Sequence, residues 1–260
     1  MDAVFSVDVE PDLHTGKFEG IDRLVLLSKM LKKHKIKGTF FVTGTVLEKY
    51  SKKIIQLKKQ GHEIALHGYA HKRYDLMSHS EQKKDLVRSI KAYYSVLKSP
   101  PKGFRAPQHS VTLELISLLK SLGIKYDSSK TPGNAMLLRH LFKNVNKKEI
   151  LQNFFSKLKP YHFNGIIEIP RSSFIISTGG FELKLYPKIS YKILISLYRI
   201  FNIPLIFVMH SWDLINVPSL TNKICSKEKF CLNLDSFLRY AAKKFKFITM
   251  EELYEKTKDS

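Results

Sequence analysis

Short runs of β-forming residues alternate with longer amphipathic segments along most of the chain. Strands are expected at residues 3–7, 39–43, 63–66, 103–107, 124–126, 166–169, 204–209 and 247–249. Between them, apolar residues recur at helical spacing at residues 21–31, 46–60, about 78–97, 113–122, 189–201 and 234–244, and a last helix starts near residue 251. Such alternation predicts a parallel sheet or barrel with helices outside it. We therefore predict an α/β fold built as a barrel-like (β/α) domain.

The alternation is interrupted once, between about residues 131 and 165. This stretch is basic and has weak strand patterns, with one helical piece near residues 149–158. A long excursion between two strands often forms a rim or lid beside a site. The chain has 260 residues, which is enough for one substantial core. We expect a single domain over residues 1–260 that carries this basic insertion.

Basic residues greatly outnumber acidic ones: 44 Lys and Arg against 23 Asp and Glu give a formal net charge of +21. Such a balance suits an anionic partner, which could be nucleic acid, an acidic glycan or a membrane surface. The lysines are scattered, however, and form no block of six like charges, which favours an ordinary solvated surface. Because no nucleic-acid-binding motif accompanies the charge, no nucleic-acid partner is expected.

Cysteine usage and the apolar runs bear on the cell compartment. Cys225 and Cys231 are six positions apart, which fits neither a C-x-x-C redox pair nor a zinc knuckle, and reduced thiols are favoured over a local disulfide. The first residues lack the basic start of a secretory signal peptide, so a cytoplasmic protein is expected. The most apolar long run, residues 189–209, carries basic residues and is broken by Pro204, so no transmembrane segment is expected.

Side chains with acid–base or metal-binding chemistry stand at the ends of the expected strands. Asp8 and Glu10 are two positions apart, so an extended backbone directs both carboxylates to one side. His67 and His71 follow a short strand, and if the turn between them is helical they share a face and can bind one metal ion. Each feature alone fits a polar turn or ordinary surface histidines at least as well. Later strand ends add three further side chains: Arg105, Asp127 and His210.

Parallel strands of a barrel bring all of these side chains to the same end. Together they supply the groups that metal-assisted hydrolysis needs. These are imidazole and carboxylate ligands, a second carboxylate as base, a cation to orient that base, and an acid for the leaving group.

At these residues the chain resembles the polysaccharide deacetylase family (carbohydrate esterase family 4, the NodB-homology domain). The likeness is to the branch whose first motif reads S-V-D-V-E in place of T-F-D-D-G. It covers nearly the whole chain and implies a distorted (β/α)7 barrel that binds a divalent metal, commonly zinc. The matching stretches, in family order, are residues 6–10, 61–64, 67–71, 103–107, 126–129, 168–172, 179–181 and 209–213.

The resemblance also implies a role for each of the strand-end residues. Asp8 matches the general base, and His67 and His71 match two metal-binding histidines. The family's third ligand is an acidic residue just after the base; because Val9 cannot serve, Glu10 is the candidate. Further matches are Arg105 as the residue that orients the base, His210 as the general acid, Asp127 as the carboxylate that tunes this acid, and Pro107 and Trp212 as substrate-binding residues.

For Trp212, stacking on a sugar ring and burial in the core remain equal alternatives at this point. The function that the resemblance implies is metal-dependent removal of an N-acetyl group from a sugar. The substrate would be a polysaccharide, an oligosaccharide or a lipid-linked glycan, with anionic groups favoured by the positive charge. Two alternatives stay open: hydrolysis of another non-peptide C–N bond, such as a cyclic amide, and a catalytically silent glycan-binding domain.

Overall fold

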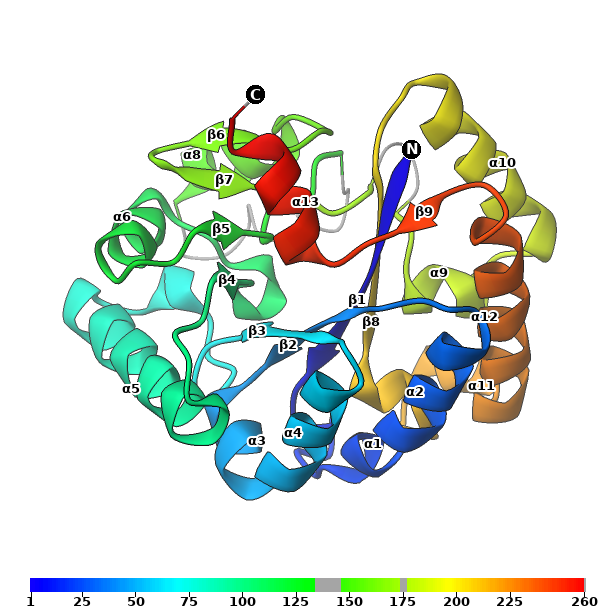
Figure 1. The fold of residues 1–260 in the computed structure, drawn as a ribbon, viewed down its shortest axis with the longest axis horizontal. Helices are drawn as coiled ribbons and strands as arrows, with labels where there is room; N and C mark the ends of the chain where they lie inside the picture. Colours follow the sequence, from blue (N-terminus) through cyan, green and yellow to red (C-terminus); the bar gives the residue numbers. More distant parts are fainter. Residues whose placement is uncertain (134–145, 174–176, 260) are drawn as a thin grey trace.

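The computed structural model describes residues 1–133, 146–173 and 177–259. Its strands form one curled sheet in the order β6-β7-β5-β4-β3-β2-β1-β8 (Figure 1). Every pairing along this order is parallel except the one between β6 and β7. The strands are β1 (Asp2–Val9), β2 (Thr39–Val42), β3 (Glu63–Leu66), β4 (Gly103–Phe104), β5 (Tyr126–Asp127), β6 (Tyr161–Phe163), β7 (Ile166–Glu168), β8 (Leu205–His210) and β9 (Lys246–Phe247).

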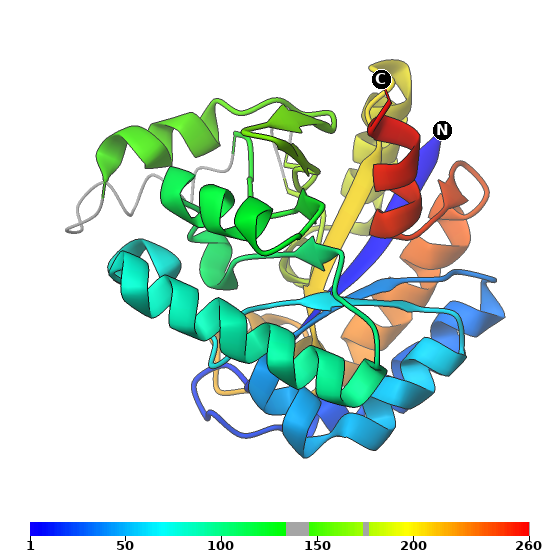
Figure 2. The same ribbon diagram turned by 60° about the vertical axis from the view of Figure 1, so that its left-hand side comes forward.

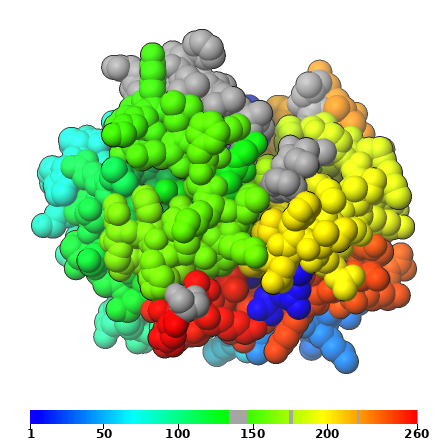
Figure 3. All heavy atoms as spheres, turned by 90° about the horizontal axis from the view of Figure 1, so that it is seen from above, coloured from blue at the N-terminus to red at the C-terminus, as the bar shows by residue number. Residues whose placement is uncertain are grey.

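Helices pack along the outside of the sheet, as Figures 1 and 2 show, and Figure 3 shows α10 (yellow) at the surface when the molecule is seen from above. The α-helices of the described residues are α1 (Glu19–Asp22), α2 (Leu24–Lys33), α3 (Gly44–Lys49), α4 (Ser51–Lys59), α5 (His79–Leu97), α6 (Leu113–Ser121), α8 (Lys147–Phe154), α9 (Gly180–Leu185), α10 (Lys188–Ile200), α11 (Leu220–Ile224), α12 (Lys227–Ala241) and α13 (Met250–Thr257). None of the helices in this part of the chain is both long and apolar enough to cross a bilayer.

The expected α/β barrel fold is confirmed. Seven mutually parallel strands of the described residues, β1 to β5 with β7 and β8, form the curled wall. Between β7 and β8 the described residues form no strand ladder. Irregular backbone links them, because the amide of Ser172 donates to the carbonyl of Ile206 and the amide of Val208 donates to that of Thr178, both at 3.3 Å. The barrel is therefore distorted at this point.

Most element positions agree with the sequence pattern, and the differences have local causes. The segments expected at 21–31 and 46–60 are each split into two helices, with breaks at Arg23 and Tyr50. The short helices α9 and α11 and the strand β6 were not expected, since pieces of three to six residues show too little periodicity to be recognised. Helix α8 begins earlier and ends earlier than the expected 149–158, and residues 134–145 of the basic insertion lie outside the described residues.

The core lies on both faces of the central strands. Every residue of β1 after Asp2 is buried, and Phe5 stacks on Phe207 of the neighbouring strand β8 with ring centroids 5.1 Å apart. A parallel sheet covered on both sides needs such continuous apolar strands. Buried polar residues at the carboxyl end of β1 include Asp8, and Glu10 follows this strand; they belong to the site described next.

Candidate active site

Asp8 and Arg105 form a buried ion pair at the carboxyl edge of the sheet. Nη1 of Arg105 donates to Oδ1 of Asp8 at 2.7 Å. The rest of the guanidinium is held by Ser6 and Ser128: Nε donates to the carbonyl of Ser128, and Nη2 donates to the hydroxyls of both serines. Burial works to raise the pKa of Asp8, but the charges of Arg105, His67 and His210 outweigh it and lower that pKa. Asp8 is therefore a carboxylate at neutral pH.

Glu10, His67 and His71 gather their ligand atoms within 4.8 Å of one another. Oε2 of Glu10 lies 3.0 Å from Nε2 of His67 and 2.6 Å from Nε2 of His71. Nδ1 of His67 donates to the carbonyl of Arg105 at 2.8 Å, because a carbonyl can only accept. The lone pair on Nε2 of His67 then faces a carboxylate oxygen, an arrangement that a proton or a metal cation must stabilise.

The donor set of this cluster fits a divalent metal ion. Two imidazole nitrogens and one carboxylate oxygen are the protein ligands of many catalytic zinc sites, which keep a further position for water or substrate. The second nitrogen of His67 is fixed by a backbone carbonyl, as the outer partners of metal-binding histidines usually are. We therefore assign Glu10, His67 and His71 as a candidate metal site of the described residues.

The turn that carries the two histidines is not helical, so the condition under which the sequence places both rings on one helix face is not met. Residues 67–73 form an irregular loop in which Gly68 has φ +70° and His71 has φ +56°. These two left-handed residues turn the chain back so that the ring of His71 reaches Glu10, with the centroids of the His67 and His71 rings 5.3 Å apart. The expected convergence of the side chains is thus reached by a different backbone path.

Trp212 links the candidate metal site to the candidate acid. Its Nε1 donates to Oε1 of Glu10 at 2.9 Å, on the carboxylate oxygen that the histidines do not contact. Its ring stacks on His210, with centroids 4.3 Å apart and planes 13° apart. Trp212 is half-buried, so it is neither fully in the core nor fully exposed at the rim. Its ring and its N–H both hold residues of the site in place.

His210 stands directly beside Asp8 in the parallel pairing of β1 with β8. Its Nε2 lies 4.0 Å from Oδ2 of Asp8, the oxygen that Arg105 leaves free. Burial works to lower the pKa of His210, but the carboxylates of Glu10, Asp213 and Asp8 outweigh it and raise that pKa to about 9. A protonated imidazole and an ionised carboxylate therefore face each other at neutral pH.

The carboxylate nearest the other side of the His210 ring is Asp213, which the sequence analysis missed. Oδ2 of Asp213 lies 3.6 Å from Nδ1 of His210 and accepts a 2.9 Å hydrogen bond from the backbone amide of His210. Oδ1 of Asp213 pairs at 2.8 Å with Lys184 of α9, and both side chains are 2% exposed. The glycine pair before Lys184 allows this approach, since a Cβ at Gly180 would overlap the Asp213 carboxylate.

The role predicted for Asp127 is corrected by this arrangement. Asp127 ends β5 and accepts a 2.6 Å hydrogen bond from the hydroxyl of Ser129, and its register partner is Glu168 of β7. Burial raises the pKa of Asp127, and burial together with the Asp127 charge raises the pKa of Glu168 well above its usual value. The raised pKa favours the protonated form of Glu168 beside Asp127 in the wall of the barrel. Asp213, and not Asp127, lies beside His210.

Pro107, which was predicted to bind substrate, is buried in the structure. It is buried at the start of the 3₁₀ turn Pro107–His109, and its ring lies under the loop at Gly68, where a Cβ would come within 3.3 Å of Cγ of Pro107. Pro107 thus supports the loop that carries His67 and His71. Its burial argues against direct contact with a sugar.

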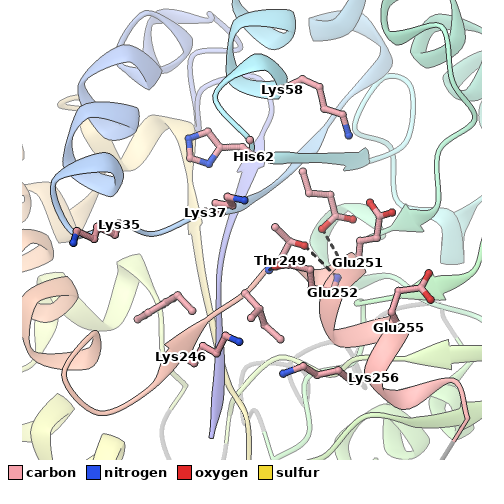
Figure 4. A pocket seen from close by; sticks show the side chains of 14 residues that line it. Lys35, Lys37, Lys58, His62, Lys246, Thr249, Glu251, Glu252, Glu255 and Lys256 are labelled. Carbon is pink, nitrogen blue, oxygen red and sulfur yellow. Dashed lines mark hydrogen bonds between the residues drawn. The ribbon is translucent and has the colours of Figure 1, made fainter.

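A separate pocket of about 570 Å³ lies at the amino-terminal ends of β2, β3 and β9, away from this site (Figure 4). Figure 4 shows Lys35, Lys37, Lys58 and Lys246 around the pocket and Glu251, Glu252, Glu255 and Lys256 on the side of α13. Glu63, from the Gly61-His62-Glu63 motif, is buried there; Oε2 of Glu63 accepts hydrogen bonds from the hydroxyl of Thr39 and the amide of Glu251. This end of the barrel holds none of the residues predicted for catalysis.

Comparison with known proteins agrees with the geometry. Residues 23–126 match the family model described as polysaccharide deacetylase. A peptidoglycan deacetylase of Helicobacter pylori is 29% identical over 122 residues, which are 47% of this chain and 42% of that protein. Over these residues the chain is similar to polysaccharide deacetylases. A peptidoglycan deacetylase-like protein of Gibberella zeae is 33% identical over 128 residues, 48% of this chain and 38% of that protein, so the matches span less than half of these relatives.

Solved structures of polysaccharide deacetylases and related proteins share the fold. A candidate polysaccharide deacetylase of Mycobacterium smegmatis superimposes with a TM-score of 0.72 at 18% identity, over 99% of this chain and 90% of that one. An allantoinase gives 0.67 at 15% identity, over 98% and 89% of the two chains. A pseudoenzyme of carbohydrate esterase family 4 from Bacillus anthracis gives 0.59 at 15% identity, over 99% and 66%.

Proposed function

We propose that this protein hydrolyses the N-acetyl group of an acetylated amino sugar, with a divalent metal ion, most simply zinc, held by Glu10, His67 and His71. The observation that carries the proposal is the meeting of this ligand cluster with the Asp8–Arg105 pair and His210 at one edge of the sheet. The match of residues 23–126 to the polysaccharide deacetylase model supports the reaction class, and the curated relatives named for peptidoglycan support a bacterial-wall type of amino sugar.

Each side chain has a part in the reaction that its surroundings favour. The metal ion, when bound, polarises the acetamide carbonyl and lowers the pKa of the attacking water. Asp8 accepts the proton of that water on Oδ2, the oxygen that does not bond Arg105. His210, whose pKa the nearby Asp213 and Asp8 carboxylates raise, gives a proton to the nitrogen that leaves. Trp212 keeps the Glu10 carboxylate and the His210 ring in place.

A direct test is acetate release from N-acetylglucosamine oligomers and from peptidoglycan fragments, by protein supplied with zinc. We expect one free amine for each acetate, and we expect Asp8→Asn to reduce the rate by at least about a thousandfold, because general base catalysis and charge placement are both lost. A cyclic amide is included as substrate. Opening of the cyclic amide without acetate release from the sugars would favour the alternative of a cyclic-amide hydrolase. Tight glycan binding without turnover would favour a catalytically silent binding domain.

A further inference from the structure

Helix α10 carries an apolar row on the side that faces away from the core. Ile189, Ile193 and Ile200 are 59%, 54% and 74% exposed. At about 3.6 residues per turn these three side chains fall within about 40° of one another around the helix axis. The opposite side of the helix is buried against the protein and is made by Tyr191, Leu194, Ile195 and Tyr198. We call the three isoleucines the outer row of α10.

A basic row runs beside the outer row. Lys188, Lys192 and Arg199 are exposed and follow the same spacing one position earlier along the helix. The sequence of α10, residues 188–200, contains no Asp or Glu. Tyr186, which precedes the helix, is 45% exposed, and it adds an aromatic ring at the amino-terminal end of α10.

This combination is unusual for a helix of a water-soluble surface. Single exposed apolar residues are ordinary, but a row of three opposite the buried side leaves α10 apolar on two faces. A helix with an apolar row, a cationic flank and a nearby aromatic ring is typical of one that lies in the interface of a bilayer with anionic lipids. Figures 1 and 3 show α10 on the outside of the molecule.

The charge argues against a second copy of the chain as the occupant. Two copies joined through the outer rows would bring two basic rows together, on molecules that each carry a formal net charge of +21. Like charges at short range oppose such an interface, whereas anionic lipid headgroups attract both the basic row and the whole molecule.

We propose that α10 docks this protein on the surface of an anionic lipid bilayer, with the outer row entering the headgroup region and the basic row contacting lipid phosphates. The docking surface does not depend on the proposed hydrolysis. It is linked to the site through the chain, since α9, which carries Lys184 beside Asp213, leads directly into α10. Docking would place the protein where lipid-linked amino sugars are found.

The test is sedimentation of the full chain with vesicles of phosphatidylcholine alone or mixed with phosphatidylglycerol. We expect binding to the mixed vesicles only, weakened by salt, and reduced at least about tenfold in the triple variant Ile189→Ser/Ile193→Ser/Ile200→Ser. The matched control Leu76→Ser/Tyr94→Ser/Phe155→Ser replaces three side chains that are also exposed, by 61%, 57% and 77%, outside α10. This control should bind as the wild type does.

Three results would overturn the proposal. The first is a wild type that binds neither kind of vesicle. The second is an α10 triple variant that binds mixed vesicles as tightly as the wild type, which would assign binding to diffuse charge. The third is a concentration-dependent dimer in sedimentation velocity that the α10 triple variant loses, which would assign the outer row to a second copy. Circular dichroism of all variants checks that each remains folded.

Discussion

Arg105 and Asp8 are joined by a 2.7 Å ion pair from which solvent is excluded, since their side chains are 0% and 3% exposed. The pair uses only Oδ1 of the carboxylate, and Oδ2 faces His210. Arg105 therefore keeps Asp8 ionised and also fixes which oxygen is open to a proton. The same geometry makes Asp8 dependent on its partner, because a buried carboxylate without a cation is costly.

Arg105→Met should destabilise the protein by about 3 kcal/mol at pH 8, because Asp8 then becomes an unpaired buried charge. Without Arg105 the pKa of Asp8 rises above its unfolded value, so the folded state binds the extra proton and the deficit becomes smaller as pH falls. Urea unfolding of the variant and the wild type at pH 5 and pH 8 measures both effects.

The double variant Arg105→Met/Asp8→Asn serves as the control for that experiment. It removes both charges, so it should recover much of the stability at pH 8 while remaining inactive. If Arg105→Met lost equal stability at both pH values, the Asp8 charge would not be the cause.

Trp212→Phe should weaken metal binding by about tenfold to a hundredfold, because the hydrogen bond to Oε1 of Glu10 is lost while an aromatic ring remains against His210. Competition of the protein with a coloured zinc chelator measures the affinity. Phe237→Leu, a substitution of a buried core residue whose ring packs against Tyr191 and Phe207, is the control for general loosening. Unchanged zinc affinity in Trp212→Phe would remove Trp212 from the ligand support.

Asp213→Asn should move the alkaline limb of the activity profile to lower pH. The Asp213 carboxylate helps to raise the pKa of His210 to about 9, and the reaction needs the protonated ring. The rate then falls as pH rises through a lower pKa, by about one unit for the loss of one neighbouring charge. The measurement is kcat/KM against pH with an N-acetylated substrate.

The Asp213→Asn variant leaves Lys184 buried without its partner, which can itself destabilise the protein. The double variant Lys184→Met/Asp213→Asn removes that unpaired charge and serves as the control. It should show the same shifted limb with better stability. An alkaline limb that stays in place in both variants would show that another group sets it.

The sequence predicted the location of the site better than its internal contacts. Residues at strand ends can be predicted to lie together, because parallel strands end at the same edge of the sheet. This correctly grouped Asp8 and Glu10 with His210. The sequence does not show which aspartate contacts His210, because Asp127 and Asp213 both stand at or after the end of a strand. Only the strand register of the structure shows that Asp127 pairs with Glu168. The loop after β3 also escaped prediction, since left-handed φ at a histidine has no clear sequence signal.

Glu63→Gln should remove a pH-dependent loss of stability. Burial raises the pKa of Glu63 to about 7, whereas an unfolded glutamate titrates near about 4.3. The folded state therefore binds more protons between these values, and the wild type loses about 3 kcal/mol as pH rises from about 4 to about 8. Glutamine imitates the protonated form, so urea unfolding of the variant should show a flatter profile. An equal decline in both proteins would assign the loss to other groups.

Glu10, His67 and His71 should act as the ligands of one metal ion, and the metal content of the purified protein measures this. Wild type, Glu10→Ala, His67→Ala and Lys58→Ala, the last as a surface control, are each incubated with zinc, freed of excess ion and analysed by mass spectrometry. We expect about one zinc per chain in the wild type and in Lys58→Ala, as for a single three-ligand site, and loss of zinc in both ligand variants. A wild type that retains no metal, or ligand variants that retain it fully, would show that these residues do not form a metal site.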